Sequence, residues 1–421
     1  MAICKGAESD HSEPNWQSEV FHLVICLTDV LQIVHCAKTF YCRIMTTEQN
    51  KTNLSRRLRV LFVISDLSGG GAERAVSTYL HHLDRSRFEP GLCLWRDIRA
   101  YPVPEDVPVW VTGKSKSWHT PLTILKMARL VKRWQPDIVL SQLRYVNLLT
   151  GFACAISRQH ACWIPSIQNN PENEDAVRIN SLLMPLMKRA SKVVTVSHGI
   201  ETQLIERFHF PKENVTVMYN PVDFGPIEAE YPVRDDDKNA DLRIVTMGRL
   251  TRQKDHRTLL QAVARVSRDH NVKLIILGEG PMRNELESFA AALGIQQSVE
   301  FRGFISNPFG IIKGADIFVL SSKWEGHPLA LMEAMACATT AIATRCPTGP
   351  EEIIENGENG ILVPVEDDEA LSRAIVNFLS DEAKRERLAK EGYERVKKQF
   401  GIECRTQALE NLFLSVAGCH R

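Results

Sequence analysis

Short apolar runs alternate with helical patterns along most of the chain, beginning at Leu58. The runs LRVLFVIS, DIVLSQ and KVVTVS are near-continuous apolar segments, and stretches such as RAVSTYLHHL between them have helical character. Strands that are apolar almost throughout, alternating with helices, are typical of parallel sheets covered on both faces. The pattern therefore predicts an α/β fold.

The alternation stops between Asn220 and Leu242, where the sequence is rich in proline and charge and has no period. Such a stretch is typical of a linker between domains. The pattern then restarts with RIVTMG and continues through KLIILGEG and DIFVLSS. The simplest architecture is two doubly wound domains that face a cleft, over residues 56–222 and 223–395, followed by a helix in residues 396–421.

The first 55 residues lack this alternation. Their apolar part, EVFHLVICLTDVLQIVHCAKTFYC, is interrupted by polar residues such as Asp29 and Lys38. A transmembrane helix needs about 20 mostly apolar residues, and a signal peptide needs a basic start and a small-residue cleavage site. Neither description matches, so we expect residues 1–55 to be an atypical extension and the natural start to be Met45. A membrane-surface helix and a disordered tail are the alternatives.

Composition excludes some classes of function. The 51 lysines and arginines balance 51 aspartates and glutamates, so the net charge gives no indication of a nucleic-acid partner. The 11 cysteines include no C-x-x-C pair. This scatter argues against a zinc site or a disulfide framework and fits a reducing compartment. We therefore expect a cytoplasmic protein that does not bind nucleic acid.

The glycine-rich loop SGGGAE is the first candidate for chemistry, because ligands bind doubly wound sheets at the carboxyl ends of their strands. Its consecutive Gly69, Gly70 and Gly71 let the backbone approach a ligand with free N–H groups. The loop has neither the dinucleotide G-x-G-x-x-G fingerprint nor the P-loop's G-K-[ST] ending. An ordinary flexible turn is the alternative.

The second candidate is MGRLTRQKDH, which follows a predicted strand and supplies Arg249, Arg252 and Lys254 just before a helix. Arginine forks onto phosphate oxygens, and lysine adds a compact charge. Cations ahead of a helix N-terminus would suit a diphosphate. A solvated surface turn is the alternative, since turns with three cations are common.

The third candidate, WEGHPLALMEA, places Glu325 and Glu333 on either side of a Gly-His-Pro turn. Pro328 suits the first turn of a helix, and the side chain of Glu333 leans back toward the start of that helix. Both carboxylates can therefore address the same cleft mouth. The alternative for Glu333 is a residue favoured there only by the helix dipole.

Three chemistries can be weighed for these carboxylates. A metal site would need further acidic or histidine ligands at tight spacing, and none is evident in the sequence. A glycosidase pair is conceivable, but it would leave the cations of the second turn without a role. A sugar nucleotide uses every part, because cations and N–H groups bind the diphosphate while carboxylates accept hydrogen bonds from hydroxyls.

Taken together, these motifs resemble the family 4 retaining glycosyltransferases of the GT-B fold. The resemblance rests on the E-x7-E spacing, the G-R-x4-K of the second turn, LGEGP after a strand, and the segments FRGF, GADIFVLSS, GHPLALMEAMA, NGILVP, SGGGAERAV and YNPVD. It runs from about Leu58 to the end of the chain. CPTGPEEII is most similar to bacterial members that transfer hexoses or N-acetylhexosamines onto lipid-linked glycans.

The resemblance implies a role for each part of the site. Arg249 and Lys254 would bind the donor diphosphate and stabilise the departing nucleotide. Glu333 would hold the ribose hydroxyls, and Glu325 would contact the transferred sugar and act with the two cations in catalysis. The glycine-rich loop would let the N-terminal, acceptor-binding domain approach the reacting centre, and the last helix would cross back to that domain. The implied donor-binding set is Gly248, Arg249, Lys254, Glu325, Gly326, His327, Pro328, Leu329 and Glu333.

Such enzymes use no metal or cofactor and transfer with retention, by front-face attack in which the leaving phosphate helps to take the acceptor's proton. Many relatives carry a histidine after the strand that corresponds to DIVLSQ, and this chain has none there. Ser141 and Asn147 match the serine and asparagine common in the favoured subgroup. A proton-transfer role for His327 is the less favoured interpretation, and a loop residue with a functional backbone is the alternative.

Two basic amphipathic stretches, PLTILKMARLVKRWQ and SLLMPLMKRASK, predict peripheral contact with the inner face of the cytoplasmic membrane. Solvated helix faces are the alternative. We expect a nucleotide-sugar donor, UDP by resemblance, and a glycan or lipid-linked acceptor in polysaccharide or lipopolysaccharide synthesis. A sugar-nucleotide epimerase or hydrolase and a catalytically silent binding protein remain the alternatives, although all four charged motif residues are intact.

Overall fold

The computed structural model describes most of the chain, comprising residues 56–114, 116, 119–171, 177–233 and 242–418. The predicted extension over residues 1–55, with its expected start at Met45, lies outside these residues.

Within the described chain, seven strands form the N-terminal sheet, and all its neighbouring strands are parallel. The strands are β1 (Leu58–Ile64), β2 (Phe88–Leu94), β3 (Val109–Val111), β4 (Ile138–Gln142), β5 (Cys162–Ile167), β6 (Val193–Thr195) and β7 (Val215–Val217). Their order is β3-β2-β1-β4-β5-β6-β7. The strand order therefore reverses between β1 and β4, which is the switch point where doubly wound sheets bind ligands.

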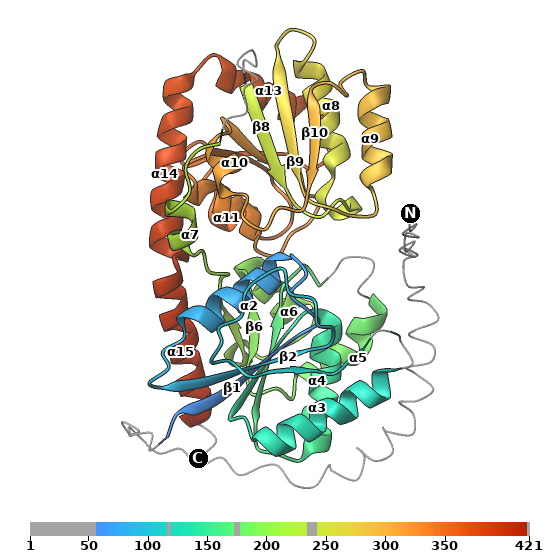
Figure 1. Cartoon of the computed structure of the whole chain (residues 1–421), viewed down its shortest axis with the longest axis vertical. Coiled ribbons are helices and arrows are strands. Elements are labelled where there is room, and N and C mark those ends of the chain that lie inside the picture. Colours follow the sequence, from blue (N-terminus) through green and yellow to red (C-terminus); the bar gives the residue numbers. More distant parts are fainter. Residues whose placement is uncertain (1–55, 115, 117–118, 172–176, 234–241, 419–421) are drawn as a thin grey trace, which may run out of the picture.

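The C-terminal sheet repeats this plan with six described parallel strands. They are β8 (Leu242–Met247), β9 (Val272–Leu277), β10 (Val299–Gly303), β11 (Ile317–Leu320), β12 (Thr340–Thr344) and β13 (Ile361–Val363). The order is β10-β9-β8-β11-β12-β13, so the second switch point lies between β8 and β11. The prediction of two doubly wound α/β domains is confirmed (Figure 1).

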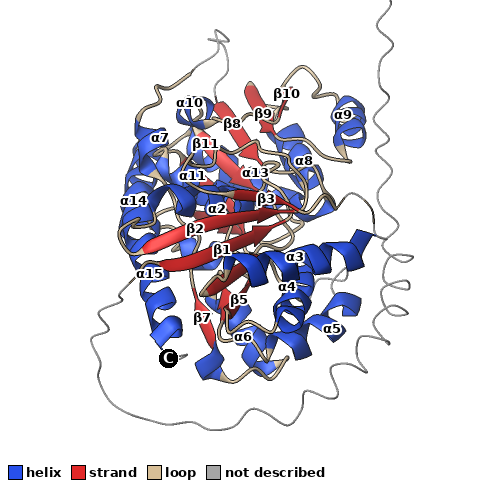
Figure 2. Cartoon of the chain, turned by 60° about the horizontal axis from the view of Figure 1, so that its bottom comes forward, coloured by secondary structure: helices blue, strands red, loops and turns tan. Residues whose placement is uncertain are grey.

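Helices cover both faces of each sheet, as Figure 2 shows. Successive residues of β1 alternate between the two sides: Val60 and Phe62 belong to one apolar cluster, and Leu61 and Val63 to another. This alternation is the reason that the strand is apolar throughout. The described helices are α2 (Gly71–His82), α3 (Thr120–Trp134), α4 (Arg144–Ser157), α5 (Val177–Met187), α6 (His198–Glu206), α7 (Phe224–Glu228), α8 (His256–Val266), α9 (Arg283–Ala292), α10 (Phe309–Lys313), α11 (Leu329–Ala336), α12 (Pro350–Ile353), α13 (Asp368–Leu379), α14 (Glu382–Phe400) and α15 (Ile402–Gly418).

The last two helices run along both domains, one after the other (Figure 1). Helix α14 packs against α11 and β12 of the C-terminal domain, and α15 packs against α2 of the N-terminal domain. Phe413 of α15 sits between Phe62 and Phe88, with ring centroids 6.4 and 5.9 Å away. The stretch between Asn220 and Leu242, predicted to lack periodic structure, contains the short helix α7 in its described part.

Candidate active site

The turns after β8 and β11 bring opposite charges together at the second switch point. The turn after β8 ends in a short 3-10 helix that carries Lys254, and the loop after β11 carries Glu325. The Nζ atom of Lys254 lies 2.5 Å from Oε1 of Glu325, and the Ser322 hydroxyl donates to the same oxygen at 2.6 Å. Their side chains are 18% and 7% exposed, so the pair is largely shielded from water.

Glycines of the LGEGP segment give the turn after β8 its shape. Gly278, at the end of β9, has a φ of +146° that side chains rarely adopt, and a side-chain carbon there would overlap the carbonyl of Gly248. The N–H of Gly248 donates to the Leu277 carbonyl at 2.9 Å. A carbon on Gly280 would overlap the carbonyl of Leu250. This segment therefore allows the cation-bearing turn to lie directly on the neighbouring strand end.

The loop that carries Glu325 is held from both sides. The amide of Gln253 donates to the Trp324 carbonyl at 2.9 Å, and the Thr348 hydroxyl donates to the carbonyl of Glu325. Thr348 belongs to the CPTGPEEII turn after β12. These bonds fix the loop backbone before Pro328, which is the N-cap of α11.

Glu333, in α11, is 5% exposed and has a different partner from Glu325. Its Oε1 lies 2.7 Å from Nη1 of Arg74 on α2 of the N-terminal domain. Burial raises the pKa of Glu333, and the Arg74 guanidinium partly opposes that rise. The structure thus gives each carboxylate of the E-x7-E motif a cation of its own.

The ring of His327 faces the protein interior. It is 3% exposed and packs against Tyr219 and Phe400, with ring centroids 4.8 and 5.0 Å away. Within the described residues, neither ring nitrogen has a hydrogen-bond partner. Burial lowers the pKa of His327 to about 3, so the ring is neutral near pH 7. Its carbonyl accepts from the Asn220 amide at 3.1 Å, which leaves the backbone as the part that shapes the loop.

The glycine-rich loop lies against the C-terminal domain. Gly69 has a φ of +123°, and a side-chain carbon there would lie 2.6 Å from the ring of Phe304. Gly70 caps α2, and Gly71 begins it, with a carbon on Gly71 reaching ordinary contact, 3.5 Å, with Leu329. This loop and the start of α11 are therefore neighbours across the two domains.

Arg249 lies in the same region as the glycine-rich loop. Burial raises the pKa of Glu73, in the first turn of α2, and the charge of Arg249 opposes that rise. The cation-bearing turn of one domain is thus electrostatically coupled to the first helix of the other.

Two further contacts between the domains were missed in the sequence. A side-chain carbon on Gly326 would overlap the carbonyl of Gln168, in the loop after β5. The carboxylate of Glu352 accepts from the backbone N–H groups of His198 and Gly199, at 2.9 and 3.0 Å. Both residues fall within motifs that were recognised, but a single sequence does not show which far segment will face them.

Ser141 and Asn147 bond to each other inside the N-terminal domain. The Ser141 hydroxyl donates to the side-chain oxygen of Asn147 at 2.7 Å and accepts from the Trp163 indole at 2.9 Å. The Asn147 amide donates to the Ser166 carbonyl at 2.8 Å. Both residues are fully buried. The network fixes the end of β4 against α4, where Leu143 has a positive φ of 74°.

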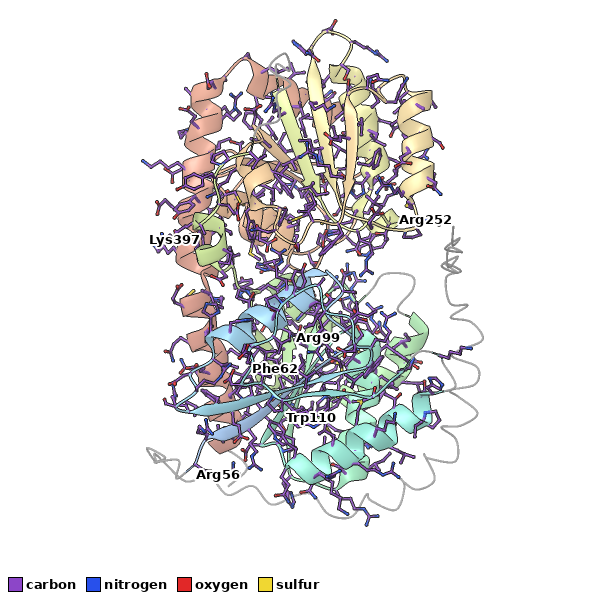
Figure 3. The ribbon with its side chains drawn as sticks, viewed as in Figure 1. Arg56, Phe62, Arg99, Trp110, Arg252 and Lys397 are labelled. Atoms are coloured by element: carbon purple, nitrogen blue, oxygen red, sulfur yellow. The ribbon has the colours of Figure 1, made fainter. Side chains whose placement is uncertain are left out.

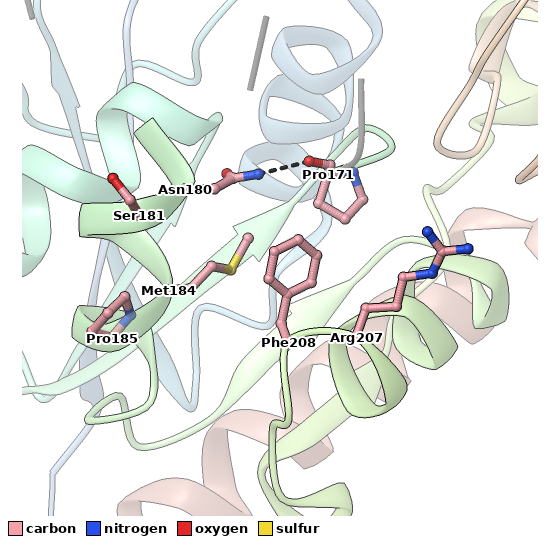
Figure 4. A pocket seen from close by; sticks show the side chains of 7 residues that line it. All are labelled: Pro171, Asn180, Ser181, Met184, Pro185, Arg207 and Phe208. Atoms are coloured by element: carbon pink, nitrogen blue, oxygen red, sulfur yellow. Dashed lines mark hydrogen bonds between the residues drawn. The ribbon is translucent and has the colours of Figure 1, made fainter. Parts of the chain in front are cut away.

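A hollow of about 560 Å³ lies elsewhere in the N-terminal domain, beside α5 and the end of α6 (Figure 4). Its lining residues are Pro171, Asn180, Ser181, Met184, Pro185, Arg207 and Phe208. None of the predicted donor-binding residues lines it, so we place the candidate active site at the switch point and not in this hollow.

Among the described residues, no three histidine, cysteine or acidic side chains gather in a way that could hold a metal ion. Within the same residues, every helix is too short or too polar to span a membrane.

Comparison with known proteins places the chain in a family. Residues 69–225 match the family described as Glycosyltransferase Family 4, and residues 231–395 match the family described as Glycosyl transferases group 1. The chain is 32% identical over 290 residues to the lipopolysaccharide core biosynthesis glycosyltransferase LpsD of Rhizobium meliloti, covering 68% of this chain and 78% of that one.

Two other proteins extend the similarity over nearly the whole described chain. One is the N-acetylgalactosamine-N,N'-diacetylbacillosaminyl-diphospho-undecaprenol 4-alpha-N-acetylgalactosaminyltransferase of Campylobacter jejuni, 26% identical over 364 residues, or 84% of this chain and 98% of the relative. The other is the crystal structure of Anabaena HepE in complex with UDP-glucose, with a TM-score of 0.74 and 19% identity over 85% of this chain and 100% of that one. The chain is therefore a member of the family 4 glycosyltransferases, with the GT-B fold that its motifs predicted.

Proposed function

We propose that the enzyme transfers a hexose or an N-acetylhexosamine from a UDP-sugar to a glycan or polyprenyl-diphosphate-linked acceptor, with retention of configuration. The observation that carries this proposal is the pairing of Lys254 with Glu325 at the switch point between β8 and β11, next to the turn that holds Arg249. Cations and a carboxylate so placed suit the two halves of a sugar nucleotide, its diphosphate and its hydroxyls.

The names of similar proteins support the substrate classes. Two Campylobacter jejuni relatives are named for transfer onto undecaprenyl-diphosphate-linked glycans, and two Rhizobium meliloti relatives for lipopolysaccharide core biosynthesis. Crystals of HepE contained UDP or UDP-glucose. By likeness, a uridine donor and an acceptor used in cell-surface glycan synthesis are the first substrates to test.

The proposed reaction assigns work to three residues. The bond between the anomeric carbon and the diphosphate breaks, the acceptor oxygen joins that carbon on the same face, and the acceptor's proton passes to the departing phosphate. Arg249 and Lys254 stabilise the negative charge that develops on the diphosphate. Glu325, held by Ser322, accepts hydrogen bonds from the sugar. The scheme uses no metal or histidine base, so transfer should persist in EDTA.

The test is to offer sugar nucleotides and membrane lipid extract to the full chain and follow transfer. We expect transfer to lipid-linked material by the wild type and large losses in Lys254→Ala and Glu333→Gln. Arg252→Ala removes an exposed cation of the same turn, labelled in Figure 3, and serves as the matched control. Full transfer by both site variants would contradict the assigned roles, and release of free sugar without an acceptor would favour a hydrolase.

Helix α3 supports peripheral contact with a membrane as part of this proposal. Leu122 and Leu125 are 48% and 43% exposed, and Arg129, Lys132 and Arg133 are exposed on the same helix, which contains no acidic residue. Exposed leucines among cations suit an anionic lipid surface. In the second basic stretch, Lys188 lies over the Phe210 ring and Lys192 donates to the Glu213 carbonyl, so these two cations already have partners.

Co-sedimentation with vesicles at low salt tests the membrane contact. We expect the full chain to bind vesicles that contain anionic phospholipid and not neutral ones. The double variant Leu122→Ser and Leu125→Ser should weaken binding. Equal recovery in the supernatant with both kinds of vesicle would contradict the proposal.

A further inference from the structure

Arg74 reaches from the N-terminal domain into the donor half of the site, although the motifs assigned it no role. It lies in α2, just after the glycine-rich loop, and its side chain is 15% exposed. Nη1 lies 2.7 Å from Oε1 of Glu333, and Nη2 donates to the Ser306 carbonyl at 3.1 Å. The guanidinium also lies over the rings of Tyr101 and Phe309, 4.8 and 5.3 Å from their centroids.

The residues around the Arg74 side chain form a specific binding site for one guanidinium group. Tyr101 comes from the N-terminal domain, whereas Ser306, Phe309 and Glu333 come from the C-terminal domain, so the arginine joins the two. A buried ion pair forms at a net gain only when its geometry is good and its remaining donors are satisfied. The carboxylate, the carbonyl and the two rings meet that need.

The consequence for Glu333 follows from its burial. A carboxyl group that is 5% exposed is driven toward its neutral form. The neutral form carries an O–H donor and so has less capacity to accept hydrogen bonds from the hydroxyl groups of a ribose. Arg74 favours the ionised form and fixes its direction. It is bonded to Oε1, and a carboxylate has acceptor sites on both oxygens, so capacity remains for sugar hydroxyls.

We propose that Arg74 is a positioning residue that orients Glu333 for the ribose hydroxyls of the donor, so that the N-terminal domain takes part in nucleotide binding. This inference rests on the proposed role of Glu333 as the ribose-binding carboxylate. It predicts that nucleotide affinity depends on a residue of the acceptor domain, and that this dependence disappears when the nucleotide lacks ribose hydroxyls.

The experiment compares UDP with 2',3'-dideoxy-UDP by calorimetry. The wild type should bind UDP about 10-fold or more tightly than the dideoxy analogue, since hydrogen bonds to a charged group are stronger than those between neutral groups. Arg74→Ala should lose most of that preference by weakening UDP alone, and Arg74→Lys should restore part of it. Glu333→Gln combined with Arg74→Ala should lose no more than either single variant.

Arg87→Ala is the matched control. Arg87 also pairs with a buried carboxylate, that of Glu410 on α15, with its Nη1 3.2 Å from Oε2. It lies outside the proposed site, so its loss should leave the preference for UDP intact even if stability falls. Where Arg74→Ala fails to fold, Arg74→Lys gives the same comparison at smaller amplitude.

The outcomes separate this inference from the proposed function. A wild type that binds both nucleotides equally overturns the ribose role of Glu333 and the inference with it. A wild type that prefers UDP, together with an Arg74→Ala variant that keeps the full preference, overturns the inference alone. Tighter UDP binding by Arg74→Ala also overturns it, because the arginine would then compete with the ribose.

Discussion

The two switch points of this enzyme have the same topology but hold different kinds of residue. After β8 and β11, charged side chains pair within the C-terminal domain, as Lys254 and Glu325 do. After β1 and β4, the N-terminal domain offers a glycine-rich loop, a buried serine–asparagine network and Arg74, which points into the other domain. In the proposed reaction, the charged residues that act on the donor therefore lie on one sheet, while the other sheet supplies shape and support.

Replacing Glu325 tests this contrast with the largest expected effect. Glu325→Gln removes the charge that faces Lys254, and we expect transfer to fall by about 10²-fold or more, as for other groups that act on charge in the transition state.

Ser141→Ala is the counterpart at the other switch point. It leaves the partners of Ser141 unsatisfied, so it should reduce the free energy of unfolding by about 1–3 kcal/mol while kcat changes little.

Measurements of kcat/KM and of urea unfolding on both variants distinguish a catalytic role from a stabilising one. A hundredfold loss of kcat in Ser141→Ala at unchanged stability would reverse the comparison, since the N-terminal switch point would then carry chemistry.

Gly326→Ala tests whether the N-terminal domain acts through close backbone approach. The added carbon would overlap the Gln168 carbonyl and push the loop that carries Glu325 away from the N-terminal domain. A misplacement of about 1 Å can cost about 10²-fold in rate, so kcat/KM should fall roughly 10- to 100-fold. Gly418→Ala is the control, because a carbon at the end of α15 would meet nothing within 4 Å. Wild-type kcat/KM in Gly326→Ala would show that the two domains do not need this approach.

His327 tests whether every polar residue of the loop after β11 serves chemistry. Burial lowers its pKa from 6.5 to about 3, so its contribution to stability is present above pH 6.5 and is lost as pH falls toward 3. From pH 7.5 to pH 5 this loss amounts to about 2 kcal/mol. Urea unfolding of His327→Phe should lack that part of the pH dependence.

The exposed His160→Phe is the control for this titration and should keep the wild-type slope. A His327→Phe variant that shows the same slope as the wild type would mean that the ring is not held neutral in the fold.

Glu352 gives the smallest expected effect. Its carboxylate accepts from two N–H groups at the start of α6 and from the Tyr219 hydroxyl, at 2.9 to 3.0 Å. Glu352→Gln turns an amide group toward these donors and should lower the free energy of unfolding by about 1 kcal/mol. The neighbouring Glu351→Gln breaks only an exposed pair with Arg345 and should have almost no effect. If the two variants lowered the free energy of unfolding equally, the contact between Glu352 and the start of α6 would contribute no more to stability than an exposed ion pair.

The fold could be predicted from the sequence because most strands are buried on both faces and therefore read as apolar runs. The helix α4 was not predicted, since it is buried around most of its circumference and has no clear polar stripe, as Val146, Leu148 and Leu149 illustrate. The short β3 carried too few residues to show a period.

The site could be predicted only where its parts are local in sequence. The turns that carry Lys254 and Glu325 were recognised, and the structure joins them. Their partners across the domains, such as Arg74 for Glu333 and Gln168 for Gly326, depend on how two separate sheets meet. No periodicity or spacing within a single sequence shows which residues of the two domains will be in contact.

Hydrogen–deuterium exchange with and without UDP tests whether the donor binds at the switch point of the C-terminal sheet. We expect UDP to slow exchange in residues 248–254 and 322–333, with smaller protection at the start of α2. Protection confined to the turn after β4 or to the hollow beside α5, with residues 248–254 and 322–333 unchanged, would contradict it.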